Sequence, residues 1–266
     1  MFADALRKEL GQRAAAYAKK NNLSVRTSKS GVVIFGADDR TSTHGNFLKP
    51  SYENILKHIE WKNRLEKAHA SAAKAFSKED GIRELDSCMS SDALLMNIFC
   101  HPRAGEWKSL KSLLGVTTIE PYFGFKAGVK RKGRGDETEI DMKLERLVIE
   151  SKLTEADFQQ KSVDVVESYD RFEKVFHKEM LPKSRKGYFN YQLIRNILAA
   201  EQHICRFCLI CDGRRPDLVR EFYLTVRCVK NEGLRERMGV IFWQEIAKAV
   251  GNELKAYMME KYGLGA

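Results

Sequence analysis

The sequence predicts an α/β core behind a mainly helical N-terminal region. Two observations carry this prediction. Apolar residues recur at helical spacing through the first third of the chain, whereas later segments contain the alternating and β-branched runs typical of strands. Because helical and extended segments then alternate, a layered core is expected behind the first helices. We therefore expect a helical region over residues 1–88 and a core domain over residues 89–266.

The first third of the 266-residue chain is expected to be mainly helical. Its first segment is alanine-rich and amphipathic, and Ser51 can cap a second, longer helix. A polar loop and an irregular charged stretch separate these helices from each other and from the core. The expected elements are a helix over 2–20, strands over 23–27 and 32–35, and a helix from Ser51 to about Phe76.

The core domain is expected to alternate helices and strands. Ser90 to Asp92 can cap a helix that His101-Pro102 stops, and an aromatic extended segment begins near Thr118. Pro182 and Gly187 separate two further helical segments. The expected helices cover residues 90–99, 107–114, 155–178, 188–204, 216–223 and 240–262, and the expected strands cover residues 118–125, 139–152 as a pair, and 204–211.

Residues 139–152 carry the main functional signal. Residues 139–144 alternate strictly between charged and apolar side chains, and the following β-branched run ends in Glu150-Ser151-Lys152. This pattern is typical of two strands joined by a turn at Glu145-Arg146. In that register Asp141 faces Glu150, and opposed side chains share one face with Cβ atoms roughly 5 Å apart. Lys152, two residues after Glu150, points to the same side.

Two carboxylates at that separation repel each other, and Lys152 compensates only in part. A divalent cation resolves the conflict, because Mg²⁺ takes one or two carboxylates together with water and phosphate oxygens. Glu139 would face Lys152, as its partner or as an outer-sphere acid. The turn is the open point, since Glu145-Arg146 lacks the Asn or Gly that two-residue turns prefer. A four-residue loop over 144–147 would preserve the same facing pairs.

The formal net charge of +10 favours a polyanionic partner. A glycine-containing basic stretch directly precedes the strand pair, and a flexible basic loop there would suit phosphate contacts. A solvated loop without a ligand is the alternative. The basic residues of this stretch are Lys126, Lys130, Arg131, Lys132 and Arg134.

Cys205, Cys208 and Cys211 have a spacing that can bind a metal or an iron–sulfur cluster. The residues between them are largely apolar, and Asp212-Gly213 closes the run like a turn after a buried strand. On a strand Cys208 would point away from the other two cysteines. We therefore expect buried core cysteines rather than a metal site.

The arrangement of Asp141, an eight-residue gap and Glu150-Ser151-Lys152 resembles the PD-(D/E)XK nuclease superfamily, which has the restriction-endonuclease-like fold. The expected order of elements over residues 90–230 is similar to that core. The segments 90–93 and 191–196 also look similar to helices that flank the site in bacterial members. Ile140 stands where the superfamily pattern has proline, a position that varies widely among its members. The resemblance implies a nuclease domain over residues 89–266, with a mixed central sheet flanked by helices.

The resemblance also implies roles for the site residues. Asp141 and Glu150 would bind one or two Mg²⁺ or Mn²⁺ ions, helped by the Ser151 carbonyl. Lys152 would position or deprotonate the attacking water and stabilise charge on the phosphorane, while the metal lowers the pKa of its bound water. An N-cap role explains Asp92 equally well, and a polar helix face explains Gln192 and Arg195. The candidates for an additional acid or a phosphate contact are Asp92, Glu120, Glu139, Gln192 and Arg195.

We therefore expect a metal-dependent nuclease that hydrolyses phosphodiester bonds in DNA, of the restriction-endonuclease type. Two alternatives stay open: a nucleic-acid-binding or assembly module that has lost catalysis, and an RNA-cleaving or toxin-type effector. The intact set of two acids and a lysine favours the first hypothesis, with DNA preferred over RNA as the partner. Pairing into a homodimer also stays open.

No segment approaches the ~18 uninterrupted apolar residues of a transmembrane helix. The first ten residues alternate apolar and charged side chains and lack the apolar core of a signal peptide. A cytoplasmic protein without a membrane partner is therefore expected.

Overall fold

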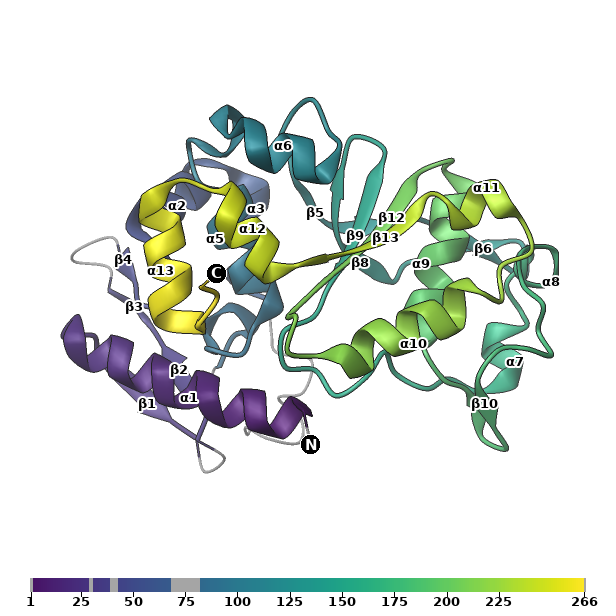
Figure 1. The fold of residues 1–266 in the computed structure, drawn as a ribbon, viewed down its shortest axis with the longest axis horizontal. Helices are drawn as coiled ribbons and strands as arrows, with labels where there is room; N and C mark the ends of the chain where they lie inside the picture. The colour runs from purple at the N-terminus through teal and green to yellow at the C-terminus, as the bar shows by residue number, and fades with distance from the viewer. Residues whose placement is uncertain (1, 29–30, 39–42, 68–81, 266) are drawn as a thin grey trace. The chain divides into compact units, whose positions relative to one another are not determined.

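The computed structural model describes residues 2–28, 31–38, 43–67 and 82–265. Their contacts divide the chain into two compact units, which are described separately (Figure 1). The first unit contains residues 1–120 and 243–266, and the second contains residues 121–242. The domain boundary expected after residue 88 stays a prediction. Within the described residues, no helix combines the length and apolar character needed to cross a membrane.

The first unit is mainly helical, as expected for the start of the chain. Its first helix packs against its last one, and a small hairpin of β1 with β2 lies beside the first helix. The Ser90 hydroxyl caps α5 by accepting the Ala93 N–H at 3.1 Å, which confirms the predicted start of that helix. The elements are α1 (Phe2–Lys20), β1 (Val25–Thr27), β2 (Val33–Phe35), β3 (Ala37–Asp38), β4 (Thr43–His44), α2 (Lys49–Lys57), α3 (Ile59–Arg64), η2 (Glu84–Asp86), α5 (Ser91–Phe99), η3 (Ala104–Glu106), α6 (Lys108–Leu114), α12 (Trp243–Ala249) and α13 (Asn252–Tyr262).

The long helix expected from Ser51 to about Phe76 is wrong in its described part. The helix α2 begins before Ser51 and gives way at His58, which has an extended backbone, to the separate α3. Ser51 is fully buried, and its hydroxyl donates to the Asn97 carbonyl rather than capping a helix. Residues 68–76 of that expected helix lie outside the described residues.

The second unit is built on a five-stranded mixed sheet with the order β13-β12-β9-β8-β5. The pairs β5 with β8 and β8 with β9 are antiparallel, whereas β12 runs parallel to both β9 and β13. This mixed sheet confirms the predicted α/β class and agrees with a restriction-endonuclease-like core. The strands are β5 (Tyr122–Lys126), β8 (Glu139–Leu144), β9 (Leu147–Ser151), β12 (Arg206–Cys211) and β13 (Met238–Phe242).

Two helices of the second unit build its core against the sheet. The helix α9 (Tyr191–Gln202) packs on β9 and β12, and α10 (Pro216–Val226) packs on α9 (Figure 1). The short α11 (Glu232–Arg235) precedes β13. Each parallel connection therefore carries helices, as parallel strands require. The core side chains that meet between these layers include Val148, Phe207, Leu209, Ile194, Ile197 and Phe222.

The strand over residues 204–211 is confirmed as β12, and its cysteines are buried free thiols. The single helix expected over residues 240–262 is wrong at its start. Its first apolar residues extend β13, where Val240 pairs with Leu209 and Ile241 with Ile210. The helices α12 and α13 follow, with Gly251 as the N-cap of α13. The helix α10 also continues to Val226, beyond the end expected at Tyr223.

The helix expected over residues 155–178 is wrong. The structure has two four-residue helices there, α7 (Val163–Val166) and α8 (Phe172–Val175), joined by irregular chain. The apolar side chains that suggested a helix are nevertheless buried in the core. The strands β10 (Lys183–Ser184) and β11 (Gly187–Tyr188) form a hairpin, and Lys161 bridges to Tyr188 across it.

The basic stretch over residues 126–135 is also more ordered than the loop expected there. Strands β6 (Val129–Arg131) and β7 (Arg134–Asp136) pair as a hairpin, with Lys132 and Gly133 in the two-residue turn. Both turn residues have positive φ, 49° and 75°, as a tight turn with right-handed strand twist requires. We call residues 129–136 the basic hairpin.

Candidate active site

The strand pair that carries the predicted site is confirmed in register as far as Met142 and Ile149. The predicted facing pair of Asp141 with Glu150 lies beyond these paired residues and stays a prediction. Leu144 pairs with Leu147, Lys143 with Val148, and Met142 with Ile149, so Glu145-Arg146 forms a two-residue turn. Glu145 takes a positive φ of 45°, and this backbone conformation closes the turn without glycine. The Arg146 guanidinium also donates to the Ile204 carbonyl at 2.7 Å, which ties the turn to the chain before β12.

Glu150 and Lys152 form a buried ion pair at the end of β9. The distance from Lys152 Nζ to Glu150 Oε1 is 2.7 Å, and both residues are at most 5% exposed. The other carboxylate oxygen of Glu150 accepts a hydrogen bond of 2.6 Å from the Asn196 side-chain amide, which α9 contributes. The two oxygens of Glu150 thus have different donors, one charged and one neutral. This arrangement fixes the plane of the carboxylate.

Asp141 lies beside the same strand end. Its Oδ2 atom accepts hydrogen bonds from the Ser151 backbone N–H at 2.7 Å and from the Ser151 hydroxyl at 2.9 Å. Since Ser151 stands between Glu150 and Lys152, these bonds bring the Asp141 carboxylate to the motif from the neighbouring strand β8. The structure therefore places the Asp141 carboxylate against Ser151, the residue between Glu150 and Lys152.

The charges around Lys152 oppose the effect of its burial. Burial alone would lower the pKa of the ammonium, but the carboxylates of Glu150, Glu155 and Asp141 outweigh it and raise the pKa above its usual value. The side chain of Lys152 also lies 5.8 Å from the centre of the Phe158 ring. These carboxylates therefore favour the ammonium form of Lys152.

Three further candidates lie in the second unit. The backbone carbonyl of Glu139 accepts a hydrogen bond of 2.8 Å from Arg195, and its side chain is half-buried. Arg195 is buried and donates to Asn196 Oδ1 through two nitrogens, at 3.2 and 3.0 Å. Gln192 is half-buried on α9, one helical turn before Asn196. Arg195 thus contacts Asn196, the residue that bonds to Glu150. Its hydrogen bonds to Asn196 and to the Glu139 carbonyl hold the buried guanidinium in place.

Asp92 and Glu120 belong to the first unit and are described within it. Asp92 is buried in the first turn of α5, where it pairs with Arg64 at 2.8 Å and with Lys67 at 3.7 Å. Ser90, not Asp92, caps this helix. Glu120 is exposed. Their roles as extra acids of the site stay predictions.

Four of the five basic candidates lie on the basic hairpin, and Lys126 ends the preceding strand β5. Lys130, Lys132 and Arg134 are exposed on the basic hairpin, and Lys126 pairs with Glu137 at 3.2 Å. The Arg131 guanidinium lies 6.0 Å from the centre of the Tyr169 ring. Backbone bonds from Lys132 to Ser168 and from Asp170 to Lys130 anchor the hairpin to the chain between α7 and α8. This anchored hairpin presents its basic side chains to solvent.

Asn196 is the site residue that the sequence did not single out. It is fully buried and lies next to Arg195 in a helix whose other buried residues are mainly leucine, isoleucine and alanine. Two adjacent buried polar residues on such a helix are a usable signal, because burying polar groups costs free energy unless they are hydrogen-bonded.

The donor set suits Mg²⁺ better than a structural zinc ion. Among the described residues, no group of three or more His, Cys, Asp or Glu side chains surrounds a possible metal position. Asp141 and Glu150 supply two carboxylates, and Mg²⁺ characteristically takes one or two of these, keeping its other positions for water and phosphate oxygens. These residues therefore fit the predicted cation.

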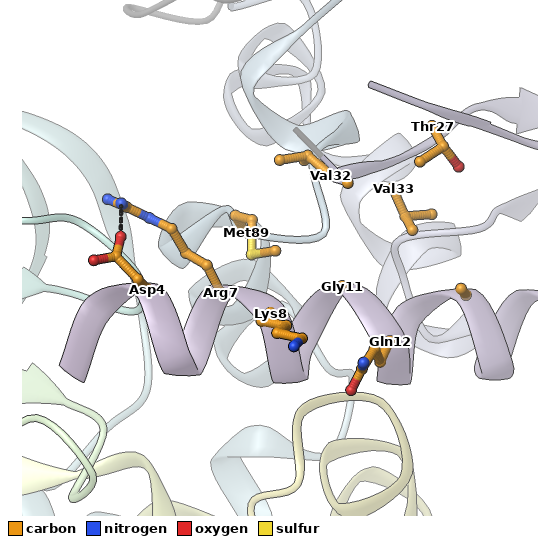
Figure 2. A pocket seen from close by; sticks show the side chains of 11 residues that line it. Asp4, Arg7, Lys8, Gly11, Gln12, Thr27, Val32, Val33 and Met89 are labelled. Carbon is orange, nitrogen blue, oxygen red and sulfur yellow. Dashed lines mark hydrogen bonds and ion pairs between the residues drawn. The ribbon is translucent and has the colours of Figure 1, made fainter. Parts of the chain in front are cut away.

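The first unit contains a separate pocket of about 700 Å³ between α1 and the hairpin of β1 with β2 (Figure 2). Its lining includes Asp4 and Arg7, which pair at 3.2 Å, and the apolar side chains of Val32, Val33 and Met89. None of the predicted catalytic residues lines it. The candidate site is thus the strand end in the second unit and not this pocket.

A comparison with family models places these observations in context. Residues 12–263 match the family described as Restriction Endonuclease associating with ARP. The chain belongs to this restriction-endonuclease family. Neither the curated proteins nor the solved structures gave a match to the chain. Membership of the family agrees with a nuclease-like function and with DNA as the substrate class, and it covers both compact units.

Proposed function

We propose that this protein is a Mg²⁺-dependent endonuclease that hydrolyses phosphodiester bonds in DNA, with a PD-(D/E)XK active site formed by Asp141, Glu150 and Lys152. The observation that supports this most directly is the joint position of these three side chains at the end of β9, with Ser151 bridging to Asp141. The match to a restriction-endonuclease family supports the reaction class and the substrate.

Each residue has a role that follows from its surroundings. Asp141 and Glu150, with the Ser151 carbonyl, would hold one or two Mg²⁺ or Mn²⁺ ions. The bound cation would supply a water of lowered pKa and neutralise charge on the phosphate. Lys152 remains an ammonium beside three carboxylates, so it would donate hydrogen bonds to the attacking water or to a phosphate oxygen.

The basic hairpin would supply contacts to the DNA backbone. Its exposed lysine and arginine side chains can neutralise phosphates, and its backbone anchors keep them in a fixed arrangement. The chain's net charge of +10 would speed the encounter with DNA. Pairing into a homodimer and a cytoplasmic location stay predictions.

Plasmid cleavage with Mg²⁺ tests this proposal. We expect Asp141→Ala and Lys152→Ala each to lower the cleavage rate by at least about 10²-fold, because each removes a group that acts directly on the reacting phosphate or its cation. Asp164→Ala and Lys174→Ala are matched controls, since both residues are exposed on the short helices α7 and α8. The controls should retain the wild-type rate.

The outcomes separate the alternatives. Full activity in either site variant would contradict the proposed site. Wild-type protein that binds DNA but cleaves no nucleic acid would favour a binding module that has lost catalysis. Cleavage of RNA in preference to DNA would favour the RNA-cleaving alternative.

A further inference from the structure

The carboxylate of Glu150 is oriented by a neutral donor that comes from a different element. The amide nitrogen of Asn196 donates to Glu150 Oε2 at 2.6 Å, while Lys152 binds Oε1 at 2.7 Å. All three residues are at most 5% exposed, so water does not readily replace these bonds. An ionised carboxylate has about four acceptor positions, and these donors leave two of them.

Arg195 determines which end of the Asn196 amide faces Glu150. Its guanidinium carries only donors, and it contacts Asn196 Oδ1 through two nitrogens at 3.2 and 3.0 Å. A flipped amide would place N–H groups against the guanidinium and an oxygen against the Glu150 carboxylate. Both contacts would be repulsive, so the orientation with the nitrogen toward Glu150 is the favourable one.

Arg195 is itself held by the sheet and by an aromatic ring. One of its nitrogens donates to the Glu139 carbonyl at 2.8 Å, and the guanidinium lies 6.0 Å from the centre of the Tyr191 ring. A chain of contacts therefore runs from the backbone of β8 through Arg195 and Asn196 to Glu150. It joins the two strands of the candidate site through α9.

A neutral donor has an advantage over a second cation at this position. A cation would compete with the metal for the charge of Glu150, whereas an amide fixes the carboxylate without neutralising it. Groups that hydrogen-bond a metal-binding carboxylate in this way commonly change metal affinity or activity by 10–100-fold when removed.

We propose that Asn196 is a positioning residue for the metal-binding carboxylate of Glu150, with Arg195 fixing the orientation of the Asn196 amide. This inference rests on the proposed nuclease function. It assigns to α9 a part in cation binding as well as in the core.

The test is Asn196→Leu, which keeps the branched shape of the side chain and removes the donor. Mn²⁺ affinity, measured without DNA by electron paramagnetic resonance, should fall 10–100-fold, and kcat at saturating plasmid should fall by a similar factor. KM for DNA should not change, because Asn196 is buried away from solvent. Gln202→Leu is the matched control, an amide on the same helix that bonds to Ala127 and Gly128 instead. It should retain wild-type Mn²⁺ affinity and kcat.

A second variant keeps the inference testable if Asn196→Leu does not fold. Asn196→Asp keeps the volume and the contact with Arg195, but it replaces the donor with a second carboxylate beside Glu150. We expect kcat to fall at least 10-fold at saturating Mn²⁺. Wild-type kcat and Mn²⁺ affinity in a folded variant would overturn the inference while leaving the nuclease proposal intact. If the wild-type protein itself neither binds Mn²⁺ nor cleaves DNA, the proposed function fails, and the inference with it.

Discussion

Among the residues that the structure describes, each compact unit buries one lysine, and the two lysines have opposite surroundings. Lys152 in the second unit is 5% exposed and is paired with Glu150, with Asp141 and Glu155 also acting on its charge. Lys261 in the first unit is 1% exposed and lies among aromatic rings, with the Phe35 ring centre 4.2 Å from Nζ. Among the described residues, no carboxylate forms an ion pair with Lys261.

The two environments shift the lysine pKa values in opposite directions. Carboxylates raise the pKa of Lys152, whereas burial lowers the pKa of Lys261 well below its usual value. The Lys261 nitrogen still has partners, the Asn46 side-chain oxygen at 2.6 Å and the Tyr257 hydroxyl at 3.0 Å. Lys152 is therefore paired with acids, whereas the polar partners of Lys261 are neutral groups. Lys261 has the partners of a structural residue.

The largest expected effect is on activity. We expect Lys152→Met to lower the plasmid cleavage rate by about 10²–10⁴-fold, because it removes the only cation bonded to Glu150 among the described contacts. Lys261→Met is the matched control, because it makes the same substitution at the other buried lysine. It should leave kcat within about twofold of wild type. Both rates are measured per folded molecule, with circular dichroism as the check on folding. An equal loss in the two variants would contradict the distinction between a catalytic and a structural buried lysine.

The next effect concerns stability and falls on the first unit. Lys261→Met leaves Asn46 Oδ1 without its Lys261 partner inside the protein, and an unsatisfied buried acceptor costs about 1–3 kcal/mol. Urea unfolding should show that loss as a lower midpoint with an unchanged slope. Unchanged stability would mean that the Asn46 oxygen accepts a hydrogen bond from another donor. The aromatic rings around position 261 would then not require a polar side chain between them.

The sequence predicted the strand pair and its charged residues because their interactions are local. Asp141, Glu150 and Lys152 lie within twelve residues, and a period of two suffices to place them together. Asn196 could not be found in this way, since its partner Glu150 is 46 residues distant in sequence. Its position depends on how α9 packs on the sheet, and periodicity within either element carries no information about that.

The helix expected over residues 155–178 failed because distant groups take its backbone bonds. The buried Arg215 guanidinium binds the carbonyls of Glu155 and Ala156, and the Gln159 carbonyl accepts the Tyr191 N–H. Gly187 permits the close approach of the chain at this point, since a Cβ there would lie 1.9 Å from the Lys161 carbonyl oxygen. The helical spacing of the apolar residues therefore predicted correctly that this segment contributes to the core, but it predicted the wrong backbone conformation.

A pH dependence sharpens the contrast between the two lysines. Because the folded-state pKa of Lys261 is lowered, the unfolded chain holds a proton that the folded protein lacks at pH values between that pKa and about 10.5. In this window the stability of wild type relative to Lys261→Met should rise with pH, by at most about 1.4 kcal/mol per pH unit. Urea unfolding of both proteins between pH 7.5 and 9.5 measures the difference. A relative stability that stays constant over this range would contradict the lowered pKa, because Lys261 would then hold its proton in both the folded and the unfolded state.

The smallest effect is expected at Lys143, a lysine on the same strand pair as Lys152. Lys143 is half-buried, and its Nζ atom lies 4.6 Å from the centre of the Phe125 ring. A cation over an aromatic ring at a partly exposed site contributes about 0.5–1 kcal/mol, so Lys143→Met should lower the free energy of unfolding by no more than that. The variant serves as the baseline for both buried lysines, since it removes the same charge without leaving a buried acceptor unpaired. A loss as large as that of Lys261→Met would mean that burial and partners do not distinguish these lysines, and that the charge alone sets the cost.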